Sequence, residues 1–332
     1  MIISKTPLRI SLGGGGTDLP FYYEKEGGFV LSAAIQKYIY ILVSNRYEEN
    51  IRVSYSQTEI CDDLEKIQHP IVRESLRLQE ITKHLEVISY ADMPGQSGLG
   101  SSGSFSVGLL HALLSFKRQD IIKKELAEMA CHIEMDVLKE PSGKQDQYIA
   151  TFGNLTSFTI KKNGDVNVEP LKISEYGKET LENNLIFFDT GITRSASEVL
   201  RDQKNNSEKN PTNLEYLSKI KEIGLKGKKC LENEDIDEFG RLMDDHWNEK
   251  KKTSSKITNS LIDKQYELAK RCGALGGKII GAGGGGFLMF YVKNGEKKKS
   301  LRKEFISSGL REVKMPFENE GSKIIVNLST KT

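Results

Sequence analysis

A short stretch rich in glycine and serine, PGQSGLGSSGSFSV at residues 94–107, carries residue types suited to binding an anion. Gly98, Gly100 and Gly103 follow the spacing G-x-G-x-x-G, and two serines precede the last glycine. Glycines let a ligand approach the backbone, free N–H groups at a helix start attract negative charge, and hydroxyls bind phosphate or a metal ion. The alternative is a plain helix start with Ser101 as its N-cap.

Dinucleotide-binding folds and protein kinases share this spacing, and the Walker A motif is a third familiar glycine-rich phosphate loop, but none of the three fits the surrounding residues. A dinucleotide fold needs an acidic residue at a second strand end, but Glu125 and Glu128 fall inside a helical pattern, which disfavours a dehydrogenase. A protein kinase needs valine where Phe105 stands, together with the tripeptides H-R-D and D-F-G, which the chain lacks. The Walker A motif ends in Lys-Ser/Thr, and here Gly-Ser-Phe follows the glycines.

Two further glycine-rich stretches occur, PLRISLGGGGTDLP at residues 7–20 and GALGGKIIGAGGGGFLMFYV at residues 273–292. Each contains four consecutive glycines next to a predicted strand. Ordering four glycines is entropically costly, so a single loop of this kind has to be stabilised by its surroundings. Three such loops in one chain suggest backbones that converge on one ligand.

The elements that must position these loops alternate between strands and helices. Runs rich in Val, Ile and Tyr predict strands in the first half, and helical periodicity dominates the second half. This mixture indicates an α/β or α+β protein. The predicted strands are 28–35, 38–45, 51–56, 85–91, 154–160, 185–189, 287–292 and 323–328, and the predicted helices are 102–116, 120–138, 195–203, 214–231, 236–250 and 257–271, with a lysine-rich helix before the last strand. The polar segment 171–184 is the predicted domain boundary.

Composition narrows the classes of partner. The 48 basic and 46 acidic residues leave a net charge of +2, so we expect no nucleic-acid partner, and the basic runs 250–252 and 297–299 are interpreted as solvated faces. No apolar run reaches the roughly 20 residues of a membrane span, and the N-terminus lacks a signal-peptide core. The four cysteines lie far apart and are expected to be free thiols, which suggests a cytoplasmic protein.

Taken together, the three glycine-rich stretches resemble the signature motifs of the GHMP small-molecule kinases. The central motif of that family, Pro followed by three residues and Gly-Leu-Gly-Ser-Ser, matches residues 94–102, and its last motif matches residues 281–286. The resemblance implies an α+β, two-domain fold with an N-terminal ribosomal-protein-S5-like α/β domain at 1–180 and a C-terminal ferredoxin-like domain at 181–332. It also implies a site in the cleft between the domains, and a homodimer is compatible with the family.

The resemblance assigns the central motif to ATP and Mg²⁺. In the family, the second serine of the pair ligates the metal ion together with a glutamate from a following helix, which implies Ser102 and Glu134. The alternative for Glu134 is a surface glutamate with an i,i+4 contact. The residues implied in ATP binding are Pro94, Gly95, Gly98, Leu99, Gly100, Ser101, Ser102, Gly103 and Ser104.

A catalytic pair is implied by the stretch EPSGKQDQY at residues 140–148, which resembles the family's Ser-Gly-x-x-Asp-Gln segment. Its aspartate, Asp146, would accept the proton of the attacking hydroxyl. Arg9 matches an arginine that pairs with this carboxylate and with the transferring phosphate. A helix cap at Asp146 and a surface arginine at position 9 are the structural alternatives.

Within the family, the motifs most resemble those of the D-glycero-D-manno-heptose 7-phosphate kinases, which phosphorylate the anomeric hydroxyl to give the 1,7-bisphosphate. Galactokinases carry Glu-His where this chain has two glycines before Thr-Asp, which favours a larger acceptor. An arginine at the start of the helix predicted at 195–203 could bind the phosphate of the acceptor, although a capped helix with a surface arginine explains it equally. The implied substrate-binding residues are Gly15, Gly16, Thr17, Asp18, Arg194, Gly283, Gly284 and Gly285.

Two other functions remain open on the sequence. L-Fucokinases share much of this motif pattern, so L-fucose is the alternative acceptor of the same chemistry. A catalytically silent sugar-binding relative would be expected to lack the base, a metal ligand or a loop glycine, and this chain keeps Asp146, Glu134 and Ser102.

Overall fold

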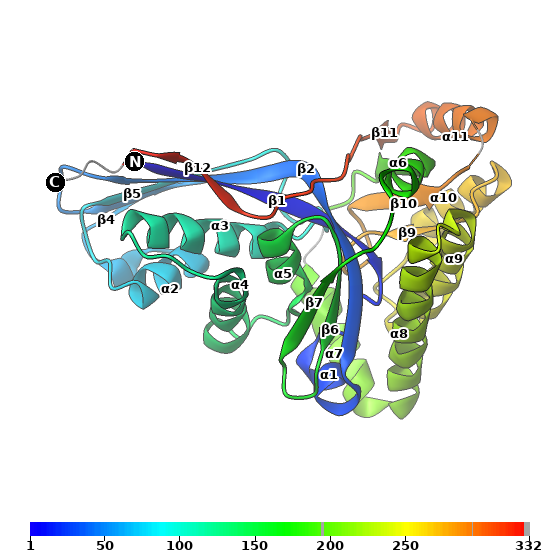
Figure 1. The fold of residues 1–332 in the computed structure, drawn as a ribbon, viewed down its shortest axis with the longest axis horizontal. Coiled ribbons are helices and arrows are strands. Elements are labelled where there is room, and N and C mark those ends of the chain that lie inside the picture. The colour runs from blue at the N-terminus through cyan, green and yellow to red at the C-terminus, as the bar shows by residue number, and fades with distance from the viewer. Residues whose placement is uncertain (194–195, 294, 329–332) are drawn as a thin grey trace.

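The computed structural model describes residues 1–193, 196–293 and 295–328, and its strands form two sheets. The larger sheet has eight strands, of which six follow the order β12-β1-β2-β5-β3-β4, while β6 pairs with β2 and β7 with β6. Figure 1 shows this sheet with helices packed beneath it and the second sheet at the other end of the molecule. The strands are β1 (Ile2–Gly13), β2 (Gly28–Asn45), β3 (Ile51–Ser54), β4 (Thr58–Cys61), β5 (Leu85–Ala91), β6 (Leu155–Ile160), β7 (Val166–Pro170) and β12 (Lys323–Asn327).

The 18-residue strand β2 organises the larger sheet. It pairs with β1 along nearly its whole length, while its other edge pairs with β6 near Gly28 and with β5 near Asn45. Alternating β-branched and aromatic residues in this strand suit a half-buried pleated surface. Because β1 ends in the first glycine-rich loop, this pairing fixes the place where that loop begins.

The helix α3 (Ser101–Phe116) lies against the sheet and carries the second glycine-rich turn at its N-terminus. A Cβ added at Gly108 would lie 2.7 Å from Thr6 Oγ1, so glycine permits the close approach of α3 to β1. The other helical segments of this half are α1 (Pro20–Glu26), η1 (Leu64–Lys66), α2 (Pro70–Leu78), α4 (Lys123–Cys131), the π-helical segment η2 (His132–Val137) and α5 (Gln145–Phe152).

The second sheet is antiparallel, with the order β11-β8-β10-β9. Apolar clusters cover both of its faces: Phe187 and Met289 belong to one cluster, and Phe188 and Phe290 belong to the other. Its elements are α6 (Glu175–Asn184), β8 (Leu185–Asp189), α7 (Ala196–Lys209), α8 (Pro211–Glu232), α9 (Ile236–Thr253), α10 (Ser260–Arg271), β9 (Gly276–Ile279), β10 (Phe287–Tyr291), α11 (Gly295–Ser307) and β11 (Arg311–Glu312).

The eight predicted strands correspond to strands of the structure, with 28–35 and 38–45 joined into the single strand β2. The single helix predicted at 120–138 is wrong in detail, because α4 begins at Lys123 and the chain widens into π-helix from His132. The segment 171–184 contains α6, whose N-cap Ser174 accepts a hydrogen bond from Gly177 N–H at 3.0 Å. The predicted domain division between residues 180 and 181 stays a prediction. The strand β12, from the C-terminal part of the chain, pairs with β1 in the larger sheet.

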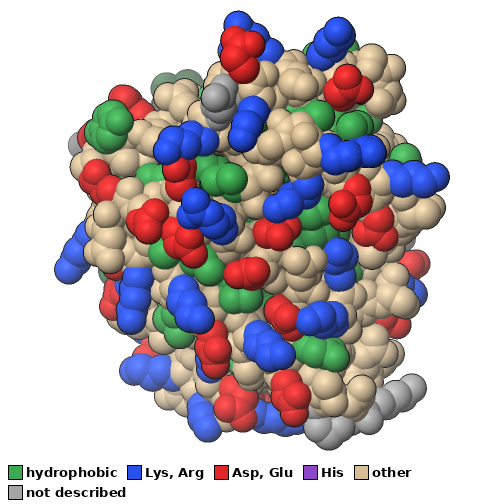
Figure 2. All heavy atoms as spheres, turned by 90° about the vertical axis from the view of Figure 1, so that its right-hand side faces the viewer, with side chains coloured by type: hydrophobic (Ala, Val, Ile, Leu, Met, Phe, Trp, Pro, Cys, Tyr) green, Lys and Arg blue, Asp and Glu red, His purple; other side chains and the backbone are tan. Residues whose placement is uncertain are grey.

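The surface around the second sheet carries charges of both signs. Figure 2 shows this side of the molecule, where basic and acidic side chains alternate and hydrophobic side chains appear only in small groups. Across residues 1–193, 196–293 and 295–328, no helix combines the length and the apolar character required to cross a membrane.

The aromatic cluster beside the second sheet gives a prediction about stability. Phe188 is fully buried, and its ring centroid lies 4.6 Å from that of Phe305. We expect Phe188→Ala to lower the free energy of unfolding by about 3–5 kcal/mol, because it removes this contact and leaves a cavity. Tyr176→Ala, at a side chain that is 76% exposed, should change it by less than about 0.5 kcal/mol. Urea unfolding of both variants provides the measurement, and equal effects would contradict the prediction.

Candidate active site

A cavity of about 300 Å³ lies where the three glycine-rich loops meet. Three helices begin at its wall, because first-turn residues of α3, α5 and α7 line it. Helix N-termini present free N–H groups and a partial positive charge, so their convergence favours an anionic ligand. The lining residues are Arg9, Ser11, Gly15, Gly16, Asp18, Leu19, Gln96, Gly98, Gly100, Ser101, Ser102, Ser142, Gly143, Gln145, Asp146, Ala196, Ser197, Leu200, Gln203, Lys250, Gly281 and Ala282.

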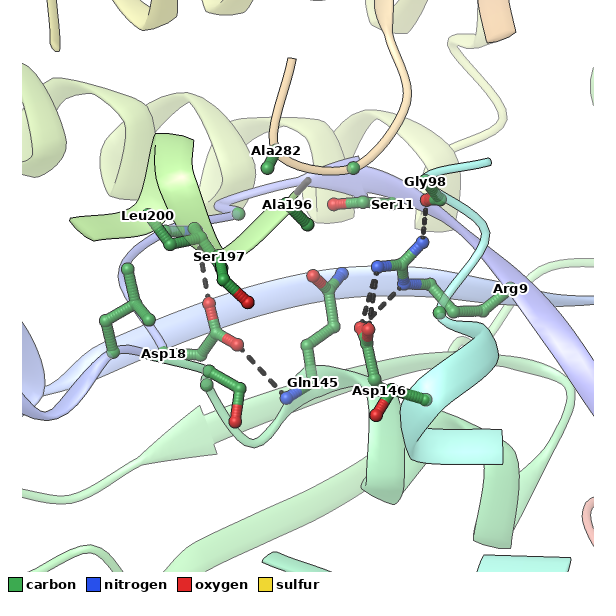
Figure 3. A pocket seen from close by; sticks show the side chains of 18 of the residues that line it. Arg9, Ser11, Asp18, Gly98, Gln145, Asp146, Ala196, Ser197, Leu200 and Ala282 are labelled. Carbon is green, nitrogen blue, oxygen red and sulfur yellow. Dashed lines mark hydrogen bonds and ion pairs between the residues drawn. The ribbon is translucent and has the colours of Figure 1, made fainter. Parts of the chain in front are cut away.

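Arg9 and Asp146 form a two-pronged ion pair at one end of the cavity, as Figure 3 shows. Arg9 Nε donates to Asp146 Oδ1 at 2.8 Å, and Nη2 donates to Oδ2 at 3.0 Å. The third guanidinium nitrogen, Nη1, donates to Gly98 O at 2.5 Å. The Arg9 side chain is 7% exposed, whereas that of Asp146 is 29% exposed. A fixed arginine therefore orients a carboxylate that can still reach a ligand.

Glycines in the second loop allow this ion pair to lie directly against α3. A Cβ at Gly103 would lie 2.6 Å from Asp146 Cβ, and a Cβ at Gly100 would lie 3.1 Å from Arg9 Cγ. Gly100 also has φ of +75° and is the N-cap of α3, so the alternative that Ser101 is the N-cap is wrong. The glycine spacing thus places the helix N-terminus, the arginine and the carboxylate side by side.

Ser102 and Glu134 meet beside this pair. Ser102 Oγ donates to Glu134 Oε2 at 2.5 Å, and Gln147 Nε2 donates to Glu134 Oε1 at 3.0 Å. Glu134 is only 3% exposed, and burial raises its pKa despite these hydrogen bonds. The surface alternative for Glu134 is therefore wrong. A buried carboxylate that accepts only neutral donors is a position where a cation would be stabilising, so the donor set suits a hard divalent ion.

The side chains around Glu134 offer few ligands for a metal ion. Among the residues that the structure describes, no three His, Cys, Asp or Glu side chains gather into a group that could hold a metal ion. Ser102 and Glu134 together offer only two oxygen donors, and a six-coordinate divalent ion would need the others from a ligand and from water.

Asp18 occupies the other end of the cavity and accepts two backbone hydrogen bonds. Gly16 N–H donates to Oδ1 and Gln145 N–H donates to Oδ2, both at 3.1 Å. A Cβ at Gly143 would lie 2.1 Å from Asp18 Oδ2, so the carboxylate is packed tightly against that backbone. Burial raises the pKa of Asp18, and Asp146 raises it further through its charge. Figure 3 shows the two aspartates on either side of Gln145.

The third glycine-rich loop packs against the second. A Cβ at Gly281 would lie 2.6 Å from Gly98 O, and a Cβ at Gly98 would lie 2.6 Å from Ile280 O. Only Gly281 and Ala282 of this loop line the cavity. Gly283 packs against Ile257, so this part of the loop is shaped by protein contacts.

The other predicted site residues divide into those at the cavity and those behind it. The cavity is also lined by the predicted residues Gly15, Gly16, Gly98 and Ser101. It is not lined by Gly284 or Gly285. Arg194 lies outside the described residues. The predicted residues behind the wall or away from it are Thr17, Pro94, Gly95, Leu99, Gly103 and Ser104. Thr17 is fully buried, and its hydroxyl donates to Gly14 O at 2.8 Å.

Several residues of the cavity were not predicted from the sequence. Ser11 is 5% exposed and its hydroxyl has no hydrogen-bond partner among the described residues. Gln145 donates through Nε2 to Ser32 Oγ at 2.5 Å. The interpretation of the run 250–252 as solvated is wrong for Lys250, which is 8% exposed and lines the cavity. Gln145 directly precedes Asp146 and Ser11 lies two residues after Arg9, whereas no predicted site residue lies near Lys250 in the chain.

The first turn of α7 closes one side of the cavity. Ala196, Ser197 and Leu200 line it, and Ser197 Oγ donates to Glu140 Oε2 at 3.0 Å. Since Glu140 precedes α5, this bond joins the two halves of the chain across the cavity rim.

Comparisons with known proteins show the family of this chain. The family model for the GHMP kinases N terminal domain matches residues 68–154, and the model for the GHMP kinases C terminal domain matches residues 228–310. A D-glycero-alpha-D-manno-heptose 7-phosphate kinase from Campylobacter jejuni is 32% identical over 91% of this chain and 94% of its own length. The chain belongs to the GHMP kinase family.

Other GHMP kinases are similar over most of this chain. A crystal structure of a D-glycero-D-manno-heptose 1-phosphate kinase from Bacteroides thetaiotaomicron superposes with a TM-score of 0.82 at 25% identity, covering 99% of this chain and 100% of that one. A bifunctional fucokinase/GDP-fucose pyrophosphorylase from Arabidopsis thaliana is 25% identical over 89% of this chain but only 30% of its own length. The protein has the two-domain GHMP kinase fold and is an ATP-dependent kinase.

The contact between Gly103 and Asp146 gives a prediction for this GHMP kinase. We expect Gly103→Ala to lower kcat by about ten- to a hundredfold, because a methyl group at this point displaces Asp146. Gly295→Ala is the matched control, since a Cβ there meets nothing within 4 Å and Gly295 lies in α11. Steady-state kinetics of both variants checks this, and an unchanged kcat in Gly103→Ala would contradict it.

The buried Asp18 gives a prediction about pH. Because its folded pKa is raised, its contribution to the free energy of unfolding is complete below the unfolded pKa, about 3.9, and is lost as pH rises through the folded pKa. In Asp18→Asn this loss is absent. We therefore expect the difference in melting temperature, Asp18→Asn minus wild type, to increase as the pH rises from about 4 to about 7. A changed hydrogen bond in the variant would shift this difference equally at every pH and would leave the trend intact. Parallel melting curves across this range would contradict the prediction.

Proposed function

We propose that the protein transfers the γ-phosphoryl group of ATP to the anomeric hydroxyl of D-glycero-D-manno-heptose 7-phosphate, giving the 1,7-bisphosphate. The single observation that carries the chemistry is the Arg9–Asp146 pair, which faces the cavity directly beside the N-terminus of α3. The choice of acceptor is supported by the 32% identity to a relative named as a kinase of that sugar phosphate.

The nucleotide would lie on the second glycine-rich loop. Gly98, Gly100 and Ser101 line the cavity there, and Ser101 Oγ is buried without a hydrogen-bond partner among the described residues. Free N–H groups at the start of α3 and this hydroxyl suit the phosphates of ATP. Ser102 and Glu134 would hold Mg²⁺, which neutralises phosphate charge when it is bound.

In the transfer step, the anomeric oxygen would form a bond to the γ-phosphorus while the bond from that phosphorus to the β-phosphate oxygen breaks, releasing ADP. Asp146 would accept the proton that leaves the hydroxyl. Arg9 orients this carboxylate through two hydrogen bonds, and its positive charge would stabilise negative charge that develops on the transferred group.

The acceptor would occupy the opposite end of the cavity, near Asp18. Its carboxylate suits sugar hydroxyls, and Gly15 and Gly16 leave space where longer side chains would obstruct a heptose. The first turn of α7 is the candidate position for the 7-phosphate, because Ala196 and Ser197 present a helix N-terminus at the wall. Arg194 stays a prediction for this phosphate.

An anomeric L-fucokinase is the second candidate function. It is supported by the fucokinase relative that aligns with 89% of this chain. The two candidates use the same catalytic pair and differ in whether the acceptor carries a phosphate.

The decisive experiment measures ADP release in MgATP with D-glycero-D-manno-heptose 7-phosphate, the unphosphorylated heptose and L-fucose. We expect turnover on the heptose phosphate and a loss of about 10²–10⁴-fold in kcat for Asp146→Asn, because the hydroxyl proton loses its acceptor. Asp245→Asn, at an exposed position of α9, is the matched control and should retain activity.

Each other outcome changes the proposal in a defined way. Turnover on L-fucose alone would retain the mechanism and replace the acceptor. Full activity in Asp146→Asn would overturn its role as base. No turnover on any sugar would overturn the proposed function and favour a silent sugar-binding relative.

A further inference from the structure

Each of the three glycine-rich segments has a backbone carbonyl that accepts a hydrogen bond from a buried basic side chain. Arg9 Nη1 donates to Gly98 O at 2.5 Å, Lys250 Nζ donates to Gly281 O, and Lys278 Nζ donates to Leu12 O at 3.2 Å. Leu12 directly precedes the four glycines of the first loop. The three basic residues are only 6%, 8% and 1% exposed, in that order. Of these three residues, the resemblance to the GHMP kinases implies a role for Arg9 alone.

Lys278 is the least expected of these residues. It lies in β9, and no carboxylate of the described residues forms an ion pair with it. Burial, and then the positive charges of Lys250 and Arg9, hold its pKa well below the usual value for lysine. Burying an amino group without a carboxylate partner costs free energy, so this position is not explained by stability.

Lys250 approaches the cavity from α9, one helical turn after His246. His246 is 1% exposed, neither ring nitrogen has a hydrogen-bond partner among the described residues, and burial lowers its pKa well below the usual value. Lys250 and Lys278 both act on His246 through their charge. The wall behind the third loop is therefore rich in basic groups and contains an imidazole that stays neutral.

A glycine-rich loop needs such contacts because it has no side chains to fix its conformation. A trans peptide unit is planar, with its C=O and the N–H of the next residue pointing in opposite directions, so holding one carbonyl also orients that N–H group. Gly281 contacts Gly98 directly, and Ala282 lines the cavity (Figure 3). A shift at Gly281 O would therefore move both the loop under the nucleotide and the cavity wall.

We propose that Lys250 and Lys278 are positioning residues for phosphoryl transfer: Lys250 fixes the loop at residues 281–286 through Gly281 O, and Lys278 fixes the loop at residues 13–16 through Leu12 O. The kinetic part of this inference rests on the proposed function. The conformational part does not, because both hydrogen bonds join residues of this chain.

Hydrogen exchange tests the conformational part directly. In Lys278→Met we expect amides in residues 13–16 to exchange about tenfold faster, with residues 281–286 unchanged, and in Lys250→Met the reverse pattern. Lys270→Met is the matched control: Lys270 Nζ donates to Leu275 O at 2.7 Å in the same part of the fold, but it does not line the cavity. This variant should leave both loops unchanged.

Kinetics and melting temperature separate positioning from a purely structural role. We expect Lys250→Met and Lys278→Met to lower kcat by about ten- to a hundredfold, and Lys250→Arg, which keeps a donor for Gly281 O, to recover part of that loss. The melting temperature of Lys278→Met should equal or exceed that of wild type, because an apolar side chain of similar length replaces a buried amino group. A structural role predicts the opposite, a lower melting temperature with kcat unchanged in the folded enzyme.

The outcomes distinguish this inference from the proposed function. Unchanged exchange in both loops would overturn the inference even if the wild type phosphorylates the heptose phosphate. Loop-specific exchange in an enzyme that phosphorylates none of the sugars would support the conformational assignment and overturn the proposed function. Loop-specific exchange with wild-type kcat would overturn the claim that positioning matters for transfer.

Discussion

The ion pair between Arg9 and Asp146 is the constraint on which the site depends. It joins the first strand to α5, two elements separated by 137 residues in the chain, and its third nitrogen holds the glycine turn before α3. This arrangement is possible only because Gly100 and Gly103 let the helix approach within contact distance of both side chains. The pairing of β1 in the sheet, the glycine spacing and the geometry of the ion pair therefore depend on one another.

The distribution of charge around the cavity follows from the same arrangement. Three helix N-termini line the cavity together with Arg9, Lys250 and the buried Asp18. The buried Glu134 and Lys278 do not line it, but Glu134 accepts a hydrogen bond from Ser102, which does, and Lys278 donates to Leu12 O. The pKa values of both carboxyl groups are raised by burial, and the pKa of Lys278 is lowered by it. Burial therefore disfavours the charged form of each group, which is typical of sites whose charges are completed by ligands.

The sequence predicted most of the fold and the residues of the motifs, because both are local signals. Strand propensity located β5 and β8, and glycine spacing located the start of α3. The short helix α5 was not predicted, since eight residues carry too little periodicity to be recognised. Lys278 was not predicted as part of the site because its partner, Leu12, lies 266 residues away, and nothing in the strand GGKI specifies that contact.

The pairing of β12 with β1 has a consequence for how the protein is made. Residues 323–327 pair with the first residues of β1, Ile2–Lys5, and a ribosome adds them more than 300 residues after that strand. During synthesis, the larger sheet therefore presents an open hydrogen-bonding edge to the cell, and such edges recruit other chains. The residues that pair between β1 and β12 are also very far apart in the sequence, and contacts of this kind are typical of slowly folding proteins. Until β12 is synthesised and pairs with β1, this edge is therefore open to association with other chains.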